Sequence, residues 1–214
     1  MGGHEIERTK TYRYLGLIVD EKLSWKDHIS EVCSKLSQVA GVIFKIRNLL
    51  NKKAMMLVYH GLVTSKLRHG LICLATANQS LLQKINVAHN TIITYLTFSK
   101  RCTRMWPLYC KLKVLPLEIL IKIEFAKTMY KFHHKMLPPV FNSYFSKPSH
   151  RYATRFSKNN LAVLRIDSAR DESRLKYSAL LVWNHVPSQI QESFFETLNF
   201  LFLRFLGVLL YSKY

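Results

Sequence analysis

Apolar residues recur at three- and four-residue spacing over long stretches of the chain, which predicts amphipathic helices. The longest such run follows Ser24, a predicted N-cap with Asp27 three residues on. Its apolar positions are Ile29, Val32, Cys33, Leu36, Val39, Ala40, Ile43, Ile46 and Leu50. A second helix is expected after Asn51, and Gly70 is expected to end it. The apolar face of that helix comprises Met55, Tyr59, Leu62, Val63 and Leu67.

The rest of the chain continues this helical pattern. Ser80 is expected to open a third helix, and Pro107 fits the first turn of a short one. The segment 117–130 is apolar on nearly all sides, which predicts a buried helix that Leu137-Pro138-Pro139 ends. A short helix is expected over 173–185, and 142–166 reads as irregular and basic. Residues 11–19 are β-branched and aromatic and predict a strand.

The last apolar stretch, 198–211, contains Arg204 and Gly207 and has fourteen residues. A bilayer span needs about 20, so a buried or dangling helix is favoured over a membrane anchor. The first residues lack an apolar stretch, so we expect no secretory signal. The cysteines have irregular spacings and predict free thiols rather than a disulfide framework or a zinc site. The expected location is intracellular, either cytoplasmic or nuclear.

Charge changes the picture more than composition does. The chain of 214 residues has 32 Lys and Arg against 13 Asp and Glu, a formal charge of +19. No acid occurs from Val32 to Leu117, where thirteen Lys and Arg lie, or from Phe125 to Ile166, where eight more lie. A solvated helix face normally mixes both signs, so these runs favour a polyanionic partner over drift in composition.

Catalytic chemistry is hard to assemble from this sequence. Two-metal phosphoryl transfer needs clustered carboxylates, and the adjacent acids are Asp20-Glu21 and Asp171-Glu172, both in expected turns or loops. The adjacent pair His133-His134 points about 100° apart on a helix, which suits one metal poorly. The other histidines considered are His28, His60, His69 and His89. They have no Glu or Cys partner at ligand spacing, so we expect them to be structural. We therefore expect no catalytic residues, no metal site and no cofactor in this chain.

Binding chemistry is better represented. Rings and cations alternate from Tyr144 to Lys158, where cations suit phosphates and rings suit unstacked bases. The candidate contacts in that segment are Arg151, Tyr152, Arg155 and Lys158. A second cluster comprises Lys45, Arg47, Lys52 and Lys53, which could instead complement a helix C-terminus. The rings of the first segment could equally anchor it to the protein's own core.

The stretch Tyr12–Ile29 contains Tyr-Leu-Gly, three apolar residues and then Asp-x-x-Leu-x-Trp-x-x-His-Ile. It closely resembles the reverse transcriptases of non-LTR retrotransposons of the jockey-like kind, in which this pattern follows the catalytic palm. Four later landmarks follow in the family's order, so that the resemblance covers about residues 10–195. They are Leu49–Tyr59, Leu137-Pro138, Thr154-Arg155 and Leu181–Pro187.

The resemblance implies that 12–20 is a primer-grip hairpin, centred on Tyr14, Leu15 and Gly16, and that the next helices are the thumb. A glycine within a strand would also allow close approach of a nucleic-acid backbone. The family's catalytic Asp-Asp, usually in Phe-Ala-Asp-Asp, is absent from this sequence. His69-Gly70 stands where the family has Tyr-Gly, the Trp that usually follows is missing, and the apolar tail replaces a basic ending.

Together these observations predict a mainly α fold: a helical, thumb-like bundle after a short β-hairpin remnant of the palm, with an irregular basic loop region. The expected parts are 1–24, 25–136 and 137–214. We expect a C-terminal fragment of a reverse transcriptase that binds RNA or RNA–DNA hybrid nonspecifically, needs no small-molecule substrate or membrane, and has no polymerase activity alone. The alternatives are a basic peripheral-membrane protein held by 194–211 and a non-functional pseudogene product.

Overall fold

The structure is a computed structural model and describes residues 8–100, 102–141, 144–145, 161, 175–186 and 191. The chain divides into two compact units, unit 1 (Met1–Leu115) and unit 2 (Pro116–Tyr214). The described part is mainly helical with an N-terminal two-stranded antiparallel hairpin, as predicted. The three-part organisation expected from the resemblance stays a prediction.

Unit 1 begins with the hairpin of β1 (Thr11–Tyr14) and β2 (Leu17–Asp20), in which Tyr12 pairs with Val19 and Tyr14 with Leu17. The residue pattern predicted a strand over 11–19, and this segment forms the two strands of the hairpin, because the backbone reverses at Leu15 and Gly16. Both residues have positive φ, 47° and 83°, as in the two-residue turns whose twist matches that of paired strands.

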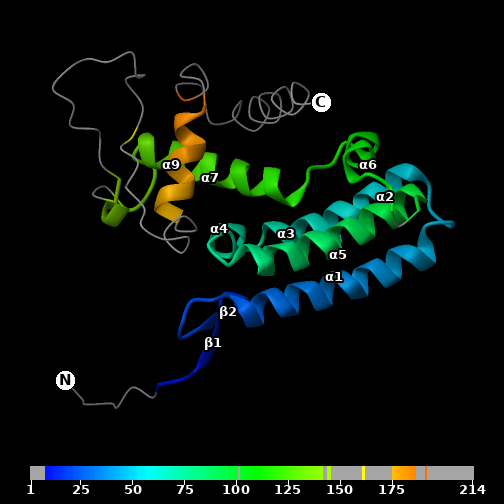
Figure 1. The fold of residues 1–214 in the computed structure, drawn as a ribbon, viewed down its shortest axis with the longest axis horizontal. Coiled ribbons are helices and arrows are strands. Elements are labelled where there is room, and N and C mark those ends of the chain that lie inside the picture. Colours follow the sequence, from blue (N-terminus) through cyan, green and yellow to red (C-terminus); the bar gives the residue numbers. More distant parts are fainter. Residues whose placement is uncertain are drawn as a thin grey trace. The chain divides into compact units, whose positions relative to one another are not determined.

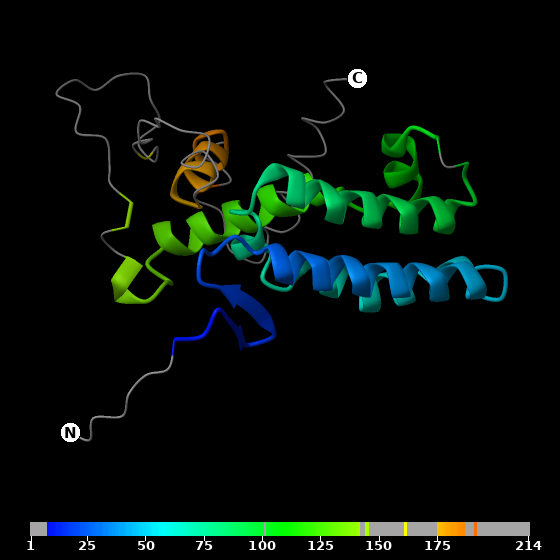
Figure 2. The same ribbon diagram turned by 60° about the horizontal axis from the view of Figure 1, so that its bottom comes forward.

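The hairpin leads into α1 (Lys26–Ile46), the longest helix of the unit (Figures 1 and 2). The predicted apolar period is confirmed at its centre, since Ile29, Leu36 and Ile43 are buried. The predicted N-cap is wrong: Trp25 occupies the cap position in a left-handed conformation without a side-chain cap bond. The Asp20 carboxylate instead accepts hydrogen bonds from the backbone N–H groups of Ser24 and Trp25.

A second helical rod follows, made of α2 (Lys52–Tyr59), the π-helical turn η1 (His60–Thr64) and α3 (Ser65–Arg68). The Asn51 side chain caps α2 by accepting from the Ala54 N–H, as predicted. Met55, Tyr59, Val63 and Leu67 are buried, whereas Leu62, expected on the same face, is exposed. Gly70 ends the rod with a φ of 64°, and α4 (Leu71–Leu74) follows.

The unit closes with α5 (Gln79–Thr97) and α6 (Met105–Leu112). Asn78, not Ser80, is the N-cap of α5, and its side chain accepts from the Ser80 N–H. In Figures 1 and 2, α5 runs alongside α1 in the same direction, and the connection from α1 to α2 lies at the end opposite the hairpin. Ile85, Ile92 and Ile93 are almost fully buried and complete the core.

Unit 2 contains α7 (Leu117–His133), the short η2 (Pro139–Phe141) and α9 (Leu175–Asn184), with α7 packed on α9. The prediction of a buried, nearly all-apolar helix is confirmed for α7, although α7 ends at His133, before Pro138. None of the helices in the described ranges is both long and apolar enough to cross a membrane. The apolar segment 198–211 lies outside the described residues.

Candidate nucleic-acid interface

The first candidate region is the tip of the hairpin, predicted at Tyr14, Leu15 and Gly16. Leu15 is 76% exposed, and Tyr12 and Tyr14 beside it are 63% and 61% exposed. Leu15 also adopts a positive φ, a conformation that favours Gly, Asn and Asp. Leu15 therefore carries backbone strain, and its exposed side chain packs little against the described residues.

Gly16 lies in the turn between β1 and β2, whereas the sequence pattern predicted that it lies within a strand. A Cβ placed at Gly16 would be 3.1 Å from His69 Nε2. Gly70 makes the matching contact, because a Cβ there would approach Leu17 Cδ2 to 2.4 Å. The two glycines therefore let the hairpin pack closely on the bundle where α3 meets α4.

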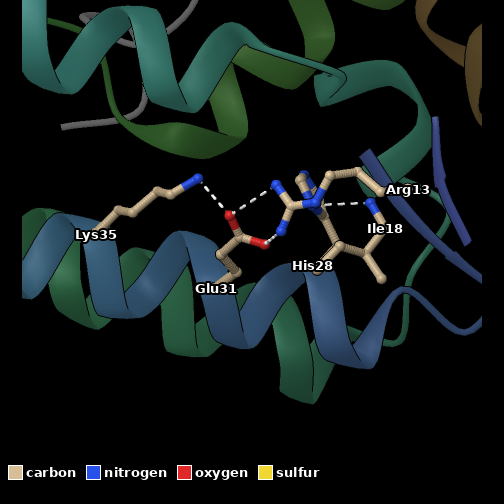
Figure 3. A network of polar contacts seen from close by, with 5 residues as sticks. All are labelled: Arg13, Ile18, His28, Glu31 and Lys35. Atoms are coloured by element: carbon tan, nitrogen blue, oxygen red, sulfur yellow. Dashed lines mark hydrogen bonds and ion pairs between the residues drawn. The ribbon is translucent and has the colours of Figure 1, made fainter. Parts of the chain in front are cut away.

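Polar contacts fix the same hairpin to α1 (Figure 3). The Arg13 guanidinium grips the Glu31 carboxylate with both nitrogens, at 3.3 and 2.7 Å, and Lys35 bonds the same carboxylate. Hydrogen bonds from Lys35 and Arg13 lower the pKa of Glu31. His28 Nδ1 accepts from the Ile18 backbone N–H at 3.3 Å. Such bidentate pairing holds the turn at a set angle to the helix.

The adjacent carboxylates of Asp20 and Glu21 both have hydrogen-bond or ion-pair partners within the fold. Burial would raise the pKa of Asp20, but hydrogen bonds from the Ser24 and Trp25 backbone lower it on balance. Glu21 pairs with Arg8 at 3.3 Å. Across the described ranges, no group of three or more His, Cys, Asp or Glu side chains could hold a metal ion.

The second candidate region is the end of the bundle where α1 gives way to α2. Lys45, Lys52 and Lys53 are exposed there, on consecutive elements. The sequence holds no acid from Val32 to Leu117, so α2 and the part of α1 after Glu31 contribute no carboxylate. This end of unit 1 consequently has a locally uncompensated positive charge.

Arg47, predicted together with these lysines, is placed differently. Its guanidinium lies 4.3 Å from the ring centre of Phe44 and 4.7 Å from that of Phe98, and Nη1 donates to the Tyr95 carbonyl at 3.4 Å. The cation therefore stacks between rings and caps the C-terminal end of α5. This ring cluster could have been suspected from the spacing of Phe44 and Arg47, one helical turn apart.

The structure keeps the two described candidate regions apart. They lie at opposite ends of α1, whose 21 residues span about 30 Å at 1.5 Å per residue. The third predicted group, Arg151, Tyr152, Arg155 and Lys158, lies outside the described residues.

A buried polar cluster at His89 joins α2, α5 and α6 and was expected only as a structural histidine. The Tyr109 hydroxyl donates to Asn90 Oδ1 at 2.6 Å, so His89 Nδ1 donates to Tyr109 Oη at 3.2 Å. His89 Nε2 then accepts from the Tyr59 hydroxyl at 2.8 Å, which satisfies a neutral imidazole on both sides. Burial lowers the pKa of His89 to about 4 and raises that of Tyr59 to about 12.

In unit 2, the landmark residues Trp183 and Asn184 hold the fold together. Trp183 is fully buried against His133, and its carbonyl accepts from Gln191 Nε2 at 3.0 Å. The Asn184 side chain forms two hydrogen bonds with the backbone of Leu161, at 3.1 and 3.0 Å. These contacts give the motif a packing role.

Comparison of the chain with known protein families, with curated proteins and with solved structures found no match.

Proposed function

We propose that this chain is a C-terminal part of a non-LTR retrotransposon reverse transcriptase that grips RNA or RNA–DNA hybrid and does not itself polymerise. The observation that carries this proposal is the exposed cationic surface of unit 1 after Glu31, a stretch that contains no acid up to the end of the unit. Its exposed cations are distributed over the helices from α1 to α6 and the segments between them. They comprise Lys45, Lys52, Lys53, Lys66, Lys84, Lys100, Arg104, Lys111 and Lys113.

Electrostatics favour a polyanion for this surface. Ion pairs join Arg8 to Glu21 and both Arg13 and Lys35 to Glu31, at or near the hairpin. Beyond Lys35 the helices carry cations without acids in the same run. Phosphate contacts release condensed counterions, which supplies affinity without sequence specificity.

The hairpin tip supports the same proposal. A strained, exposed apolar residue is expected where a turn meets another molecule, because local rules are most often broken at functional positions. In this proposal β1 and β2 are the palm edge, and α1, the α2–η1–α3 rod and α5 form the thumb. Leu15 and Tyr14 contact one end of the duplex and Lys45, Lys52 and Lys53 contact it about 30 Å away.

The test is fluorescence anisotropy of a labelled RNA–DNA hybrid with the full chain, at several salt concentrations. Six phosphate contacts give a log–log slope of roughly −5. An affinity that stays constant between about 50 and 200 mM salt contradicts the proposal. Primer extension on a primed RNA template is expected to give no product.

A pair of matched variants tests the hairpin tip. Leu15 and Leu23 both have positive φ and exposed side chains, but Leu23 lies between β2 and α1, away from the tip. Asn relieves the backbone strain at both positions, so neither L15N nor L23N is expected to lower the melting temperature. Leu15→Asn should weaken hybrid binding about tenfold through loss of an apolar contact, whereas Leu23→Asn should not. Equal effects of the two variants would exclude the tip as a contact.

A further inference from the structure

A groove of about 350 Å³ runs between α1 and α5 on unit 1. Its floor is made of small residues, Ala40 and Gly41 from α1 and Ala88 from α5. A Cβ added at Gly41 would meet no described atom within 4 Å, so the space above the floor is open. A flat group can therefore come close to the helix backbones there.

One end of the groove is closed by two aromatic rings. Phe44 and Tyr95 both line it, with ring centres 5.1 Å apart in an edge-to-face arrangement. Phe44 remains 49% exposed, although Arg47 already covers one side of its ring. The ring thus offers a partly free surface beside a cation, an arrangement that suits stacking with a further planar group.

Two hydroxyls give the groove polar edges. Ser37 Oγ donates to the Cys33 carbonyl at 2.9 Å and Thr91 Oγ1 donates to the Val87 carbonyl at 3.0 Å. Because both hydroxyl hydrogens bond backbone carbonyls, the Ser37 and Thr91 oxygens can serve a ligand only as hydrogen-bond acceptors. Amino or imino N–H groups occur on all four RNA bases, so acceptors of this kind give little sequence preference.

The charges around the groove favour an anionic ligand. Lys84 lies one turn before Ala88 on α5, so a cation lies near one end of the groove. Lys45 and Arg47 lie at the other end, one to three residues past Phe44. The helix α5 has no acid, and α1 has none after Glu31. The groove therefore combines a small apolar floor and a ring with cations at both ends.

We propose that this groove binds an unstacked base of single-stranded nucleic acid, with the flanking phosphates held by Lys84 and by Lys45. The inference rests on the proposed function and deepens it, because it assigns an unpaired strand to unit 1 in addition to the duplex. From Ser37 to Phe44 the groove is about 10 Å long, enough for one or two nucleotides.

The experiment compares wild type with Gly41→Leu, which fills the groove from open space, and with Gly61→Leu. Gly61 is an exposed helical glycine of η1 whose Cβ would also meet no described atom within 4 Å. The probes are a labelled short oligouridine and a blunt RNA–DNA hybrid, each titrated with the full chain at several salt concentrations. Circular dichroism melts report whether each variant is folded.

We expect Gly41→Leu to weaken oligouridine binding about tenfold, the worth of one stacked base, with an unchanged salt slope and unchanged hybrid binding. Gly61→Leu should match wild type on both probes. Phe44→Ala removes the ring without filling the groove and should give the same selective loss, so the test holds even if Gly41→Leu does not fold.

The other outcomes contradict one of the two proposals and are distinguishable. If oligouridine binding survives in both Gly41→Leu and Phe44→Ala, the groove does not bind a base, although the hybrid-binding function stands. If the variants lose hybrid and oligouridine binding equally, the groove is again excluded as a single-strand site. If wild type binds neither probe at low salt, the proposed function itself is wrong.

Discussion

At the scale of single residues, His89 couples the stability of unit 1 to pH. The folded state holds its pKa at about 4 by burial, whereas an unfolded chain has the ordinary value near 6.5. Above pH 6.5 the imidazole is neutral in both states. Between pH 6.5 and 4 the imidazole is protonated in the unfolded state but not in the folded state. The free energy of unfolding therefore falls as pH falls. The full effect is about 3 kcal/mol.

We therefore predict that the free energy of unfolding drops by about 2 kcal/mol between pH 7.5 and pH 5, measured by urea denaturation with circular dichroism. His28 adds to the trend in the same direction, because burial also lowers its pKa. His89→Gln retains one donor and one acceptor but does not titrate, so most of the pH dependence should vanish. A His89→Gln protein with the pH profile of wild type would show that another group is responsible.

The hydrogen-bond partners of His89 could not be predicted from the sequence pattern. The absence of a Glu or Cys partner at ligand spacing predicted a structural histidine, and burial confirms that. The partners, Tyr59 and Tyr109, are 30 and 20 residues away in the sequence. Their hydroxyls meet one imidazole only once three helices have packed.

At the scale of elements, two glycines with opposite roles show how the helices and the hairpin are joined. Gly41 lies within α1, where glycine is a poor helix former and nothing described fills the space beside it. Gly70 has a φ of 64° and accommodates Leu17 of the hairpin. The helix α1 tolerates Gly41, whereas the packing of the hairpin on the bundle requires Gly70.

The same substitution should consequently have opposite effects at these two positions. Gly41→Ala is predicted to raise the free energy of unfolding by about 1 kcal/mol through helix propensity. Gly70→Ala is predicted to lower it by about 2–4 kcal/mol, because it adds backbone strain and a clash with Leu17. Urea denaturation of both variants measures this, and a Gly70→Ala protein as stable as wild type would show that the hairpin does not pack there.

At the scale of the whole molecule, the dominant property is a charge of +19 that is unevenly distributed. In unit 1 the described ion pairs gather around the hairpin and the first turns of α1, and the rest of the bundle carries cations without acids. Like charges on one surface repel and destabilise the compact state, so a polyanion should stabilise unit 1 by binding it.

The contribution of individual cations is measurable as a change in salt dependence. Replacing Lys52 and Lys53 by Ala together should reduce the slope of log affinity against log salt by about two, for an RNA–DNA hybrid. The matched control replaces Lys122 and Lys135, two exposed lysines of unit 2, and should leave the slope unchanged. Equal changes in both double variants would mean that hybrid binding follows net charge rather than the surface of unit 1.

The sequence by itself determined the helices, because a 3.6-residue apolar period is a local property that survives in any packing arrangement. The burial of Ile29, Leu36 and Ile43 followed from this period, and the cap at Asn51 followed from the type of residue at the helix start. Caps were less predictable where competing side chains were available. Trp25 and Asn78 occupy the N-cap positions that were assigned to Ser24 and Ser80, and the Asp20 and Asn78 side chains bond backbone N–H groups at these helix starts.

The tertiary structure alone decided which residues meet. Folding placed Arg47 between rings instead of beside Lys45, set Gly16 against His69, and opened a groove between α1 and α5. Each of these depends on the rotation of one helix about its axis relative to another, which the apolar period specifies only to within a broad face. The order of charged residues is a property of the sequence and can be read from it directly. The Phe44 ring, the small residues and the cations of the groove come together only when α1 and α5 pack side by side.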